Sequence, residues 1–359
     1  MFLEQLGHSV SIVTLDDPGE PYLNDIPLTV HALGPSTGGY RFNKRLVPWL
    51  KTHARGYDGV IVNGIWQYQS FGTRRALRSL GMPYFVFIHG MLDPWFKHRY
   101  PIKHLKKWLY WPWAEYRVLR DAQAVLFTSE EERLQARRSF WLYRARERVV
   151  AYGTSNPPTD GIGLRETFLG RYPELRERRI LLFLGRIQEK KGCDLLIESF
   201  AKVAASDPTL HLVMAGPGQP AWLNRLTRLA QDRQIGGRIS WPGMLQGEMK
   251  WGAFYSAEAF ALPSHQENFG IAVAEALGCG VPVLISEKVN IWREILADGA
   301  GLAEKDTQSG TDLLLRRWLD LSADAKAAMR SNALRSFGTR FRVDAMAQDL
   351  IDVIRAAPP

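Results

Sequence analysis

HQENFGIAVAEALGCGVPVL, residues 265–284, places two glutamates eight positions apart around a short helical pattern that leads into an apolar strand. The helix is expected to begin near Phe269, and Gly270 lets a ligand approach the backbone closely. Backbone amides at such a helix N-terminus attract a phosphate. Eight residues at helical rise separate Glu267 from Glu275 by at most about 12 Å. The pattern therefore favours two hydroxyl-binding carboxylates that flank a diphosphate. A surface helix with two unrelated glutamates is the alternative, but it gives no reason to bury Glu275.

Length and composition predict two domains. The chain has 359 residues, 46% of them hydrophobic, which is more than one ordinary core buries. The sequence has no run of eighteen apolar residues and no secretion signal in MFLEQLGHSV, so we expect a cytoplasmic protein. Cys193 and Cys279 lack metal-ligand spacing and are expected to be reduced, buried thiols.

Short apolar strand patterns alternate with helical patterns, as in parallel α/β sheets. The expected strands are 9–14, 28–33, 59–64, 84–90, 124–129 and 148–153, then 179–186, 210–216, 238–243, 259–264 and 281–286. The turn-forming segment GTSNPPTDG separates the two sets. We expect one doubly wound domain at 1–153, a second at 154–340 and an amphipathic C-terminal helix at 341–359. Ligands of such sheets bind beyond the carboxyl ends of the strands.

Two other loops of the second half suit phosphate groups. GRIQEKKG offers Arg186, whose guanidinium grips phosphate oxygens, and Lys191, whose ammonium is a point charge, although an exposed basic turn has the same composition. AGPGQPA matches a dinucleotide fingerprint that begins at Gly216. The next strand pattern, RISWPG, ends without an acidic residue to hold a ribose, which disfavours a dehydrogenase. We expect Gly216 to pack closely near a nucleotide.

Taken in order, these motifs resemble the retaining glycosyltransferases of family 4, which have the GT-B architecture of two Rossmann-like domains facing a crevice. The resemblance rests on the E-x7-E spacing within 263–284, on GRIQEKKG and MAGPG, on WPGML at 241–245, on NGIWQY at 63–68 and on HGMLDPW at 89–95. It spans essentially the whole chain. It implies a nucleoside-diphosphate sugar as co-substrate, no further cofactor and no metal.

The resemblance also implies roles for individual residues. Glu275 is expected to hold the ribose hydroxyls and Glu267 to contact the donor sugar, while Arg186 and Lys191 neutralise the diphosphate. His89 resembles the family's histidine that contacts donor sugar or phosphate. The other donor-binding positions are Asn268, Phe269, Gly270, Ile271, Gly216, Met244 and Leu245, and the acceptor-side positions are Asn63, Trp66 and Asp93.

The expected function is transfer of a hexosyl unit to a saccharide or lipid-linked saccharide in surface polysaccharide or lipopolysaccharide biosynthesis. A GT-B nucleotide-sugar epimerase and a non-catalytic nucleotide-sugar-binding protein are the alternatives. The second is favoured by one departure from the family: its first strand and glycine-rich loop have no counterpart before LGHSVSIVT. Without that interior strand, neighbouring strand edges are expected to be unpaired. The family's terminal helix braces the first domain, and 341–357 matches it.

Residues 95–120 mix basic and aromatic side chains within a net charge of +9 for the chain. The mixture favours an anionic membrane surface, where aromatic rings lie at headgroup level and lysines meet phosphates. The alternative is a helix pair with a basic outer face, broken at Pro112. No nucleic-acid-binding module accompanies the basic residues, so nucleic acid is not expected as a partner. The side chains concerned are Lys97, Arg99, Lys103, Lys106 and Lys107 with Trp95, Trp108, Trp111 and Trp113.

Overall fold

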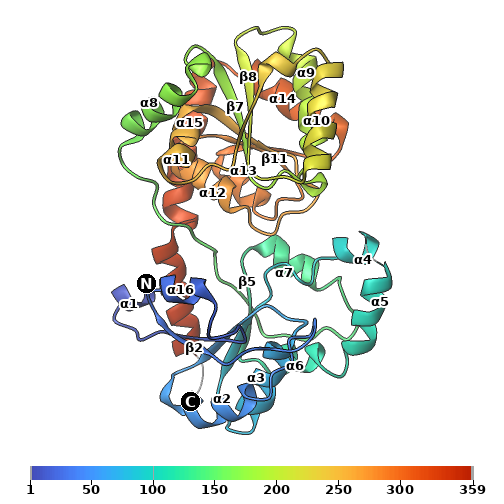
Figure 1. Ribbon diagram of the computed structural model, residues 1–359, viewed down its shortest axis with the longest axis vertical. Helices are drawn as coiled ribbons and strands as arrows, with labels where there is room; N and C mark the ends of the chain where they lie inside the picture. The colour runs from blue at the N-terminus through green and yellow to red at the C-terminus, as the bar shows by residue number, and fades with distance from the viewer. Residues whose placement is uncertain (1, 100, 357–359) are drawn as a thin grey trace. The chain divides into compact units, whose positions relative to one another are not determined.

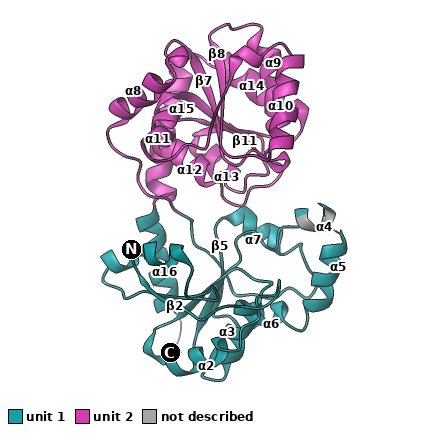
Figure 2. Ribbon diagram, viewed as in Figure 1, with its two compact units in different colours: residues 1–152, 343–359 teal, residues 153–342 magenta. Residues whose placement is uncertain are grey.

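The computed structural model describes residues 2–99 and 101–356, which form two compact units (Figure 1; Figure 2). Unit 1 comprises residues 1–152 and 343–359, and unit 2 comprises residues 153–342. Every strand pairing within their sheets is parallel. In the described part of the chain, no helix is long and apolar enough to cross a membrane.

Unit 1 holds two parallel sheets. One pairs β1 (Ser11–Thr14) with β2 (Thr29–Ala32), and the other has the order β3 (Val60–Asn63), β4 (Tyr84–Phe87), β5 (Ala124–Phe127) and β6 (Glu147–Val149). β1 and β3 are therefore edge strands. The helices are α1 (Phe2–Gln5), α2 (Leu46–His53), α3 (Tyr68–Arg78), α4 (Trp95–Arg99), α5 (Pro101–Tyr110), α6 (Glu115–Asp121), α7 (Glu130–Ala136) and α16 (Val343–Arg355), with 3-10 turns at Pro21–Asp25 and Ala54–Gly56.

The core of unit 1 explains the apolar runs YFVF and AVLF. β4 and β5 are buried along their whole length because their sheet is covered on both faces. On one face Val86 packs in a cluster with Trp111, and on the other Phe85 packs in a cluster with Leu350 of α16. Since successive strand residues point to opposite faces, an uninterrupted apolar run is needed to fill both clusters.

Unit 2 holds one six-stranded sheet in the order β12-β11-β10-β7-β8-β9. Its strands are β7 (Arg179–Leu184), β8 (Leu210–Ala215), β9 (Ile239–Gly243), β10 (Ala257–Leu262), β11 (Val283–Ser286) and β12 (Gly301–Glu304). Its helices are α8 (Gly161–Arg171), α9 (Cys193–Ala204), α10 (Pro220–Asp232), α11 (Gly247–Ser256), α12 (Ile271–Gly278), α13 (Trp292–Asp298), α14 (Gln308–Asp320) and α15 (Ala323–Arg340), with 3-10 turns at Pro173–Leu175, Glu189–Lys191 and Gly236–Arg238.

The strand patterns of the sequence correspond to β1–β11, and the predicted α/β fold is confirmed. The structure adds β12, an edge strand with the sequence GLAE, which is too short for an apolar pattern. The helical pattern over 102–120 forms two helices, α5 and α6, separated by a turn that contains Pro112. Proline lacks an amide hydrogen and cannot continue the helical hydrogen bonding there.

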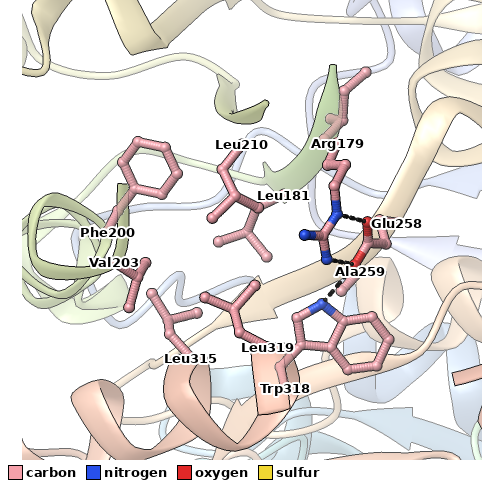
Figure 3. A pocket seen from close by; sticks show the side chains of 11 residues that line it. Arg179, Leu181, Phe200, Val203, Leu210, Glu258, Ala259, Leu315, Trp318 and Leu319 are labelled. Atoms are coloured by element: carbon pink, nitrogen blue, oxygen red, sulfur yellow. Dashed lines mark hydrogen bonds and ion pairs between the residues drawn. The ribbon is translucent and has the colours of Figure 1, made fainter. Parts of the chain in front are cut away.

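A polar network closes the amino ends of β7 and β10 in unit 2 (Figure 3). Arg179 donates from Nε and Nη2 to the two carboxylate oxygens of Glu258 at 2.6 and 2.7 Å, and Trp318 Nε1 donates to the same group at 3.1 Å. The adjoining cavity has a volume of only about 10 Å³, room for one water at most. The network is structural and lies at the sheet end opposite to the strand-end loops that carry the motifs.

Candidate functional site

Four loops meet at the carboxyl edge of the unit 2 sheet. The amide of Gly216 donates to the carbonyl of Gly243 at 2.7 Å, and the amide of His265 donates to the carbonyl of Lys190 at 2.8 Å. A Cβ on Gly216 would lie 1.8 Å from the carbonyl oxygen of Gly185, so only glycine permits this approach. These contacts bring together GRIQEKKG, AGPG, WPGML and HQENFG, which are far apart in the sequence.

The loop after β7 is fixed against the loop before α12. Gly192 has a left-handed φ of 66°, and a Cβ there would lie 2.2 Å from the carbonyl oxygen of Pro263. Ser264 Oγ donates to the carbonyl of Lys190 at 3.0 Å. This close backbone packing sets the position of Lys191.

Lys191 and Glu267 form an ion pair within this site. Their side chains are only 15% and 19% exposed, so the pair is partly shielded from solvent. Burial, followed by the charges of Lys190 and Arg186, lowers the pKa of Lys191 to about 8, whereas the paired carboxylate favours the ammonium form. Arg186 is itself exposed.

The segment that carries Glu267 is held by its backbone. Its amide donates to the carbonyl of Lys288 at 2.8 Å, and its carbonyl accepts from the amide of Asn290 at 3.0 Å. The carboxylate of Glu267 therefore starts from a fixed main chain beside α12.

α12 begins directly after Gly270, whose φ is 82° and which provides no side-chain cap. The amides of Ile271 and Ala272 open the helix at this edge of the sheet, and a helix N-terminus attracts an anion. Inside the helix, Glu275 is buried, and its Oε1 lies 2.8 Å from Nζ of Lys250 in α11. Lys250 was not among the predicted site residues. Asn268, Phe269 and Gly270 directly precede the helix, and Ile271 is its first residue.

The loop after β9 presents Met244 and Leu245 between two glycines in left-handed conformations. Gly243 has φ 73° and Gly247 has φ 52°. Met244 is 62% exposed. A short, glycine-bounded loop with an exposed apolar side chain suits contact with a planar ligand group.

In unit 1, the loops after β3 and β4 are joined to each other. Asn63 Oδ1 lies 3.0 Å from His89 Nε2, and Trp66 Nε1 donates to the carbonyl of Met91 at 3.1 Å. Trp66 and His89 adopt left-handed φ values of 77° and 47°. Such strain in residues other than glycine is concentrated at functional sites. Burial lowers the pKa of His89, which favours the neutral imidazole near pH 7.

Two buried carboxylates that were not among the predicted site residues hold these loops. Glu115 Oε1 accepts from the amide of Trp66 and from Ser70 Oγ, both at 2.9 Å. Glu132 accepts from the amides of Gly90, at 2.5 Å, and Thr128, at 2.6 Å. Burial raises the pKa of Glu115 to about 7.

Only one of the two had a recognisable sequence signal. Ser129 Oγ accepts from the amide of Glu132 at 3.1 Å, as in the S-x-x-E capping pattern.

Asp93, a predicted acceptor-side residue, makes a local contact at the start of α4. Its Oδ1 accepts from the amide of Trp95 at 2.8 Å.

α5 is an amphipathic helix with its apolar side turned outward. Ile102, Leu105 and Leu109 lie on one helical face and are 74%, 58% and 61% exposed. The opposite face packs inward through polar groups. His104 stacks on Phe140, Nζ of Lys107 lies 4.5 Å from the centre of the Trp66 ring, and Tyr110 Oη lies 2.5 Å from Tyr40 Oη.

The basic and aromatic segment differs from the expectation in two members. Lys107 turns inward, with its Nζ over the Trp66 ring, and does not lie on the exposed face of α5. Trp111 is completely buried, with its Nε1 donating to the carbonyl of Trp141 at 2.9 Å, because the turn between α5 and α6 folds it into the core. It was wrong to expect Trp111 at a lipid interface. Trp108 and Trp113 are exposed, and Trp141 adds an exposed indole from a distant loop, 6.0 Å from Trp108. Tyr100, within the same stretch, lies outside the described residues.

Within residues 2–99 and 101–356, no group of three His, Cys, Asp or Glu side chains is placed to hold a metal ion. The ion pairs Lys191–Glu267 and Lys250–Glu275, the guanidinium of Arg186 and the N-terminus of α12 lie at the carboxyl edge of the unit 2 sheet. This set can bind a polyanion through its cations and amides, and hydroxyl groups through its carboxylates.

Two family models match the chain. The model described as "Glycosyl transferases group 1" matches residues 165–335, and the "Glycosyl transferase 4-like domain" matches residues 3–153. A curated relative, the alpha-D-kanosaminyltransferase of Streptomyces kanamyceticus, is 31% identical over 189 residues, which are 52% of this chain and 48% of that protein. The match thus spans about half the length of that relative.

Solved structures share the fold. Sucrose-phosphate synthase from Thermosynechococcus elongatus superposes with a TM-score of 0.75 at 20% identity, covering 99% of this chain and 90% of that chain. HepE from Anabaena, solved in complex with UDP and glucose, gives a TM-score of 0.72 at 16% identity, covering 96% and 91%. The predicted α/β fold with parallel sheets is confirmed, and it matches structures of the GT-B fold.

Proposed function

Because the chain belongs to the glycosyltransferases of group 1 and family 4, we propose that it transfers a hexosyl unit from a nucleoside-diphosphate sugar to a saccharide or lipid-linked saccharide. The observation that carries this proposal is the grouping of Lys191, Glu267 and Glu275 around the N-terminus of α12. Cations and the backbone amides at a helix N-terminus suit the diphosphate, and carboxylates suit the hydroxyls of two sugars. A surface polysaccharide or lipopolysaccharide pathway is the proposed setting.

Each group has a proposed role in donor binding. Arg186 and Lys191 bind the diphosphate together with the amides of Asn268–Ile271. Glu275 holds the ribose hydroxyls, and Glu267 contacts the donor sugar. The main chain at Met244 and Leu245 meets the base, and Gly216 lets the nucleotide lie close to the backbone.

The proposed reaction retains the configuration of the anomeric carbon. The bond from that carbon to the phosphate oxygen breaks, and its electron pair stays on the diphosphate. The acceptor hydroxyl oxygen bonds to the carbon from the same face, and its proton passes to the departing phosphate oxygen. Arg186 and Lys191 stabilise the charge that develops on the diphosphate, which is the largest electrostatic demand of the reaction. We propose that this stabilisation comes from the protein's own cations, without a metal.

UDP-glucose is the first donor to test, since a structural neighbour was solved with UDP and glucose. In unit 1, His89 is proposed to contact donor sugar or phosphate, and Asn63, Trp66 and Asp93 to bind the acceptor. The strained loops that carry Trp66 and His89 support these assignments.

α5 supports a second proposal, that the protein binds an anionic membrane surface from the cytoplasmic side. An amphipathic helix in a soluble domain normally turns its apolar side to the core. Here the exposed stripe of Ile102, Leu105 and Leu109 is flanked by Lys103 and Lys106, and the sequence from 95 to 114 contains no acidic residue. Apolar insertion beside lysines suits lipid headgroups. Binding to anionic lipid vesicles, compared between wild type and Leu109→Asp, tests this proposal.

The transferase proposal is tested by incubating the chain with a panel of nucleotide sugars, with and without lipid-linked saccharides. Release of the nucleoside diphosphate that depends on an acceptor, with a glycosylated product of retained configuration, is the expected result. Conversion of the donor to its epimer without acceptor would instead establish an epimerase. Binding without any turnover would establish a non-catalytic protein.

A further inference from the structure

Lys250 lies where the loop proposed to bind the base meets the carboxylate proposed to bind the ribose. α11 starts at Gly247, directly after that loop, and Lys250 is in its first turn. Its Nζ is 2.8 Å from Oε1 of Glu275 in α12 and 4.1 Å from the centre of the Trp251 ring. The ammonium is thus held between a carboxylate and an aromatic face, two groups that both attract a cation.

The position of Lys250 is set by close helix packing. A Cβ on Gly252, in the middle of α11, would lie 2.3 Å from the carbonyl oxygen of Leu164 in α8. The absence of a side chain at Gly252 therefore lets α11 approach α8 closely. Lys250 and Glu275 are only 24% and 11% exposed, so neither side chain is free to sample many rotamers.

A buried carboxylate beside a diphosphate has two electrostatic costs, desolvation and repulsion by like charge. The ammonium of Lys250 reduces both. The bond to Oε1 also fixes the carboxylate plane, while the lone pairs of Oε2 and those remaining on Oε1 can accept from hydroxyls. Two neighbouring hydroxyls of a ribose have the spacing to donate to one carboxylate.

We infer that Lys250 is a positioning residue of the donor site, which orients and neutralises Glu275 so that this carboxylate can read the ribose hydroxyls of the nucleotide. The inference rests on the proposed function. It assigns a specificity role, because a site built to bond a hydroxyl rejects a ligand that lacks it. A purely structural α11–α12 ion pair has no such effect on ligand choice.

The test compares Lys250→Met, which removes the charge, with Lys250→Arg, which keeps it. Binding of uridine, guanosine and adenosine diphosphates is measured by calorimetry, followed by the 2′-deoxy form of the one that binds best. The wild type should bind the ribonucleotide roughly tenfold or more tightly than the 2′-deoxy form, because the missing hydroxyl removes a hydrogen bond to a charged group. Lys250→Met should weaken ribonucleotide binding by roughly tenfold and change 2′-deoxynucleotide binding by less than about twofold. Lys250→Arg should keep most of the preference.

Lys202→Met is the matched control, because Lys202 pairs with Asp312 at 2.6 Å in the same unit but on α9 and α14. It should leave both affinities unchanged. Equal loss of both affinities in Lys250→Met, or an unchanged preference, would overturn the inference while leaving the proposed function intact. A wild type that binds no nucleoside diphosphate overturns the proposed function and the inference with it.

Discussion

The ammonium of Lys191 is paired with the carboxylate of Glu267. The two residues are assigned to different parts of a donor molecule, yet they lie close enough to neutralise each other. A bound diphosphate offers Lys191 a second anionic partner, and a bound sugar offers Glu267 hydroxyl donors. The pair therefore keeps both charges compensated until a donor arrives.

Loss of either cation that is proposed to bind the diphosphate, Arg186 or Lys191, should strongly lower the turnover rate. Arg186→Ala and Lys191→Ala are each expected to lower kcat by roughly 100-fold to 1,000-fold, as for other charge-stabilising donors. Steady-state kinetics with the best donor and acceptor measures this. Arg176→Ala is the control, since its ion pair with Glu166 is half exposed on both sides and should matter little. Near-normal kinetics in both site variants would refute their assignment.

Donor affinity should fall in alkaline solution. The pKa of Lys191 in the free protein is about 8, lowered mainly by burial. A diphosphate favours the ammonium and raises this pKa in the complex. Affinity should therefore be constant below about pH 8 and decline above it, by up to about tenfold per pH unit. Lys191→Arg stays charged and should flatten the profile. An alkaline decline that persists in Lys191→Arg would contradict this account.

Glu115 should make unit 1 less stable as the pH rises toward neutrality. Burial raises its pKa in the folded state from 4.5 to about 7, so the folded state holds the proton more tightly. The stabilisation is full below the unfolded pKa and is lost between about pH 4.5 and 7, with a magnitude on the order of 3 kcal/mol. Glu115→Gln keeps an acceptor for the Trp66 amide but carries no charge.

The amide of Trp66, the hydroxyl of Ser70 and the ammonium of Lys107 favour the charged form of Glu115, although burial outweighs them. The pKa values of Tyr40 and Tyr110 are raised first by burial, and the charge of Glu115 adds to that effect. Thermal unfolding should show Glu115→Gln more stable than wild type near pH 8, with the difference shrinking or reversing near pH 5. A difference that is the same at both pH values would exclude titration of Glu115 as the cause.

Membrane binding should depend on the outward stripe of α5. Leu109→Asp is expected to lower binding to vesicles rich in phosphatidylglycerol by roughly tenfold or more, because it places a charge in the apolar stripe and adds repulsion from anionic lipid. Leu313→Asp, at an exposed leucine of α14, is the control. Flotation with anionic and with purely zwitterionic vesicles separates charge attraction from apolar insertion. Equal binding of wild type and Leu109→Asp would contradict the proposal, and self-association abolished by Leu109→Asp would assign the face to a second copy.

The fold could be read from the sequence because buried parallel strands are continuous apolar runs. YFVF and RILLFL fill both faces of a covered sheet and are unmistakable. β12 was not predicted, because GLAE is short and its last residue is only half buried. The order of strands in the sheets, and the separation of β1 and β2 from the other strands of unit 1, depend on hydrogen bonding between distant segments, which no local pattern encodes.

The candidate site could be read only in part for a similar reason. Glycines and charged residues at strand ends mark the motif loops, so the grouping of Lys191 and Glu267 was foreseeable. Lys250 contacts Glu275 from another helix. A lysine in a helix is usually exposed to solvent, so nothing in the sequence around Lys250 marked it as a site residue. Glu115 is buried by tertiary packing within a stretch whose basic and aromatic composition pointed to a surface.

The most direct test of the donor site is the change in stability of unit 2 on adding nucleoside diphosphates and their sugars, measured for wild type and Glu275→Gln. At a hundredfold excess over the dissociation constant, a true ligand adds about 2.7 kcal/mol to the free energy of unfolding. Glu248→Gln, an exposed glutamate of α11, is the control. We expect a shift in stability that is selective for one base, is kept in Glu248→Gln and is largely lost in Glu275→Gln. A shift of the same size in Glu275→Gln, or none with any ligand, would contradict it.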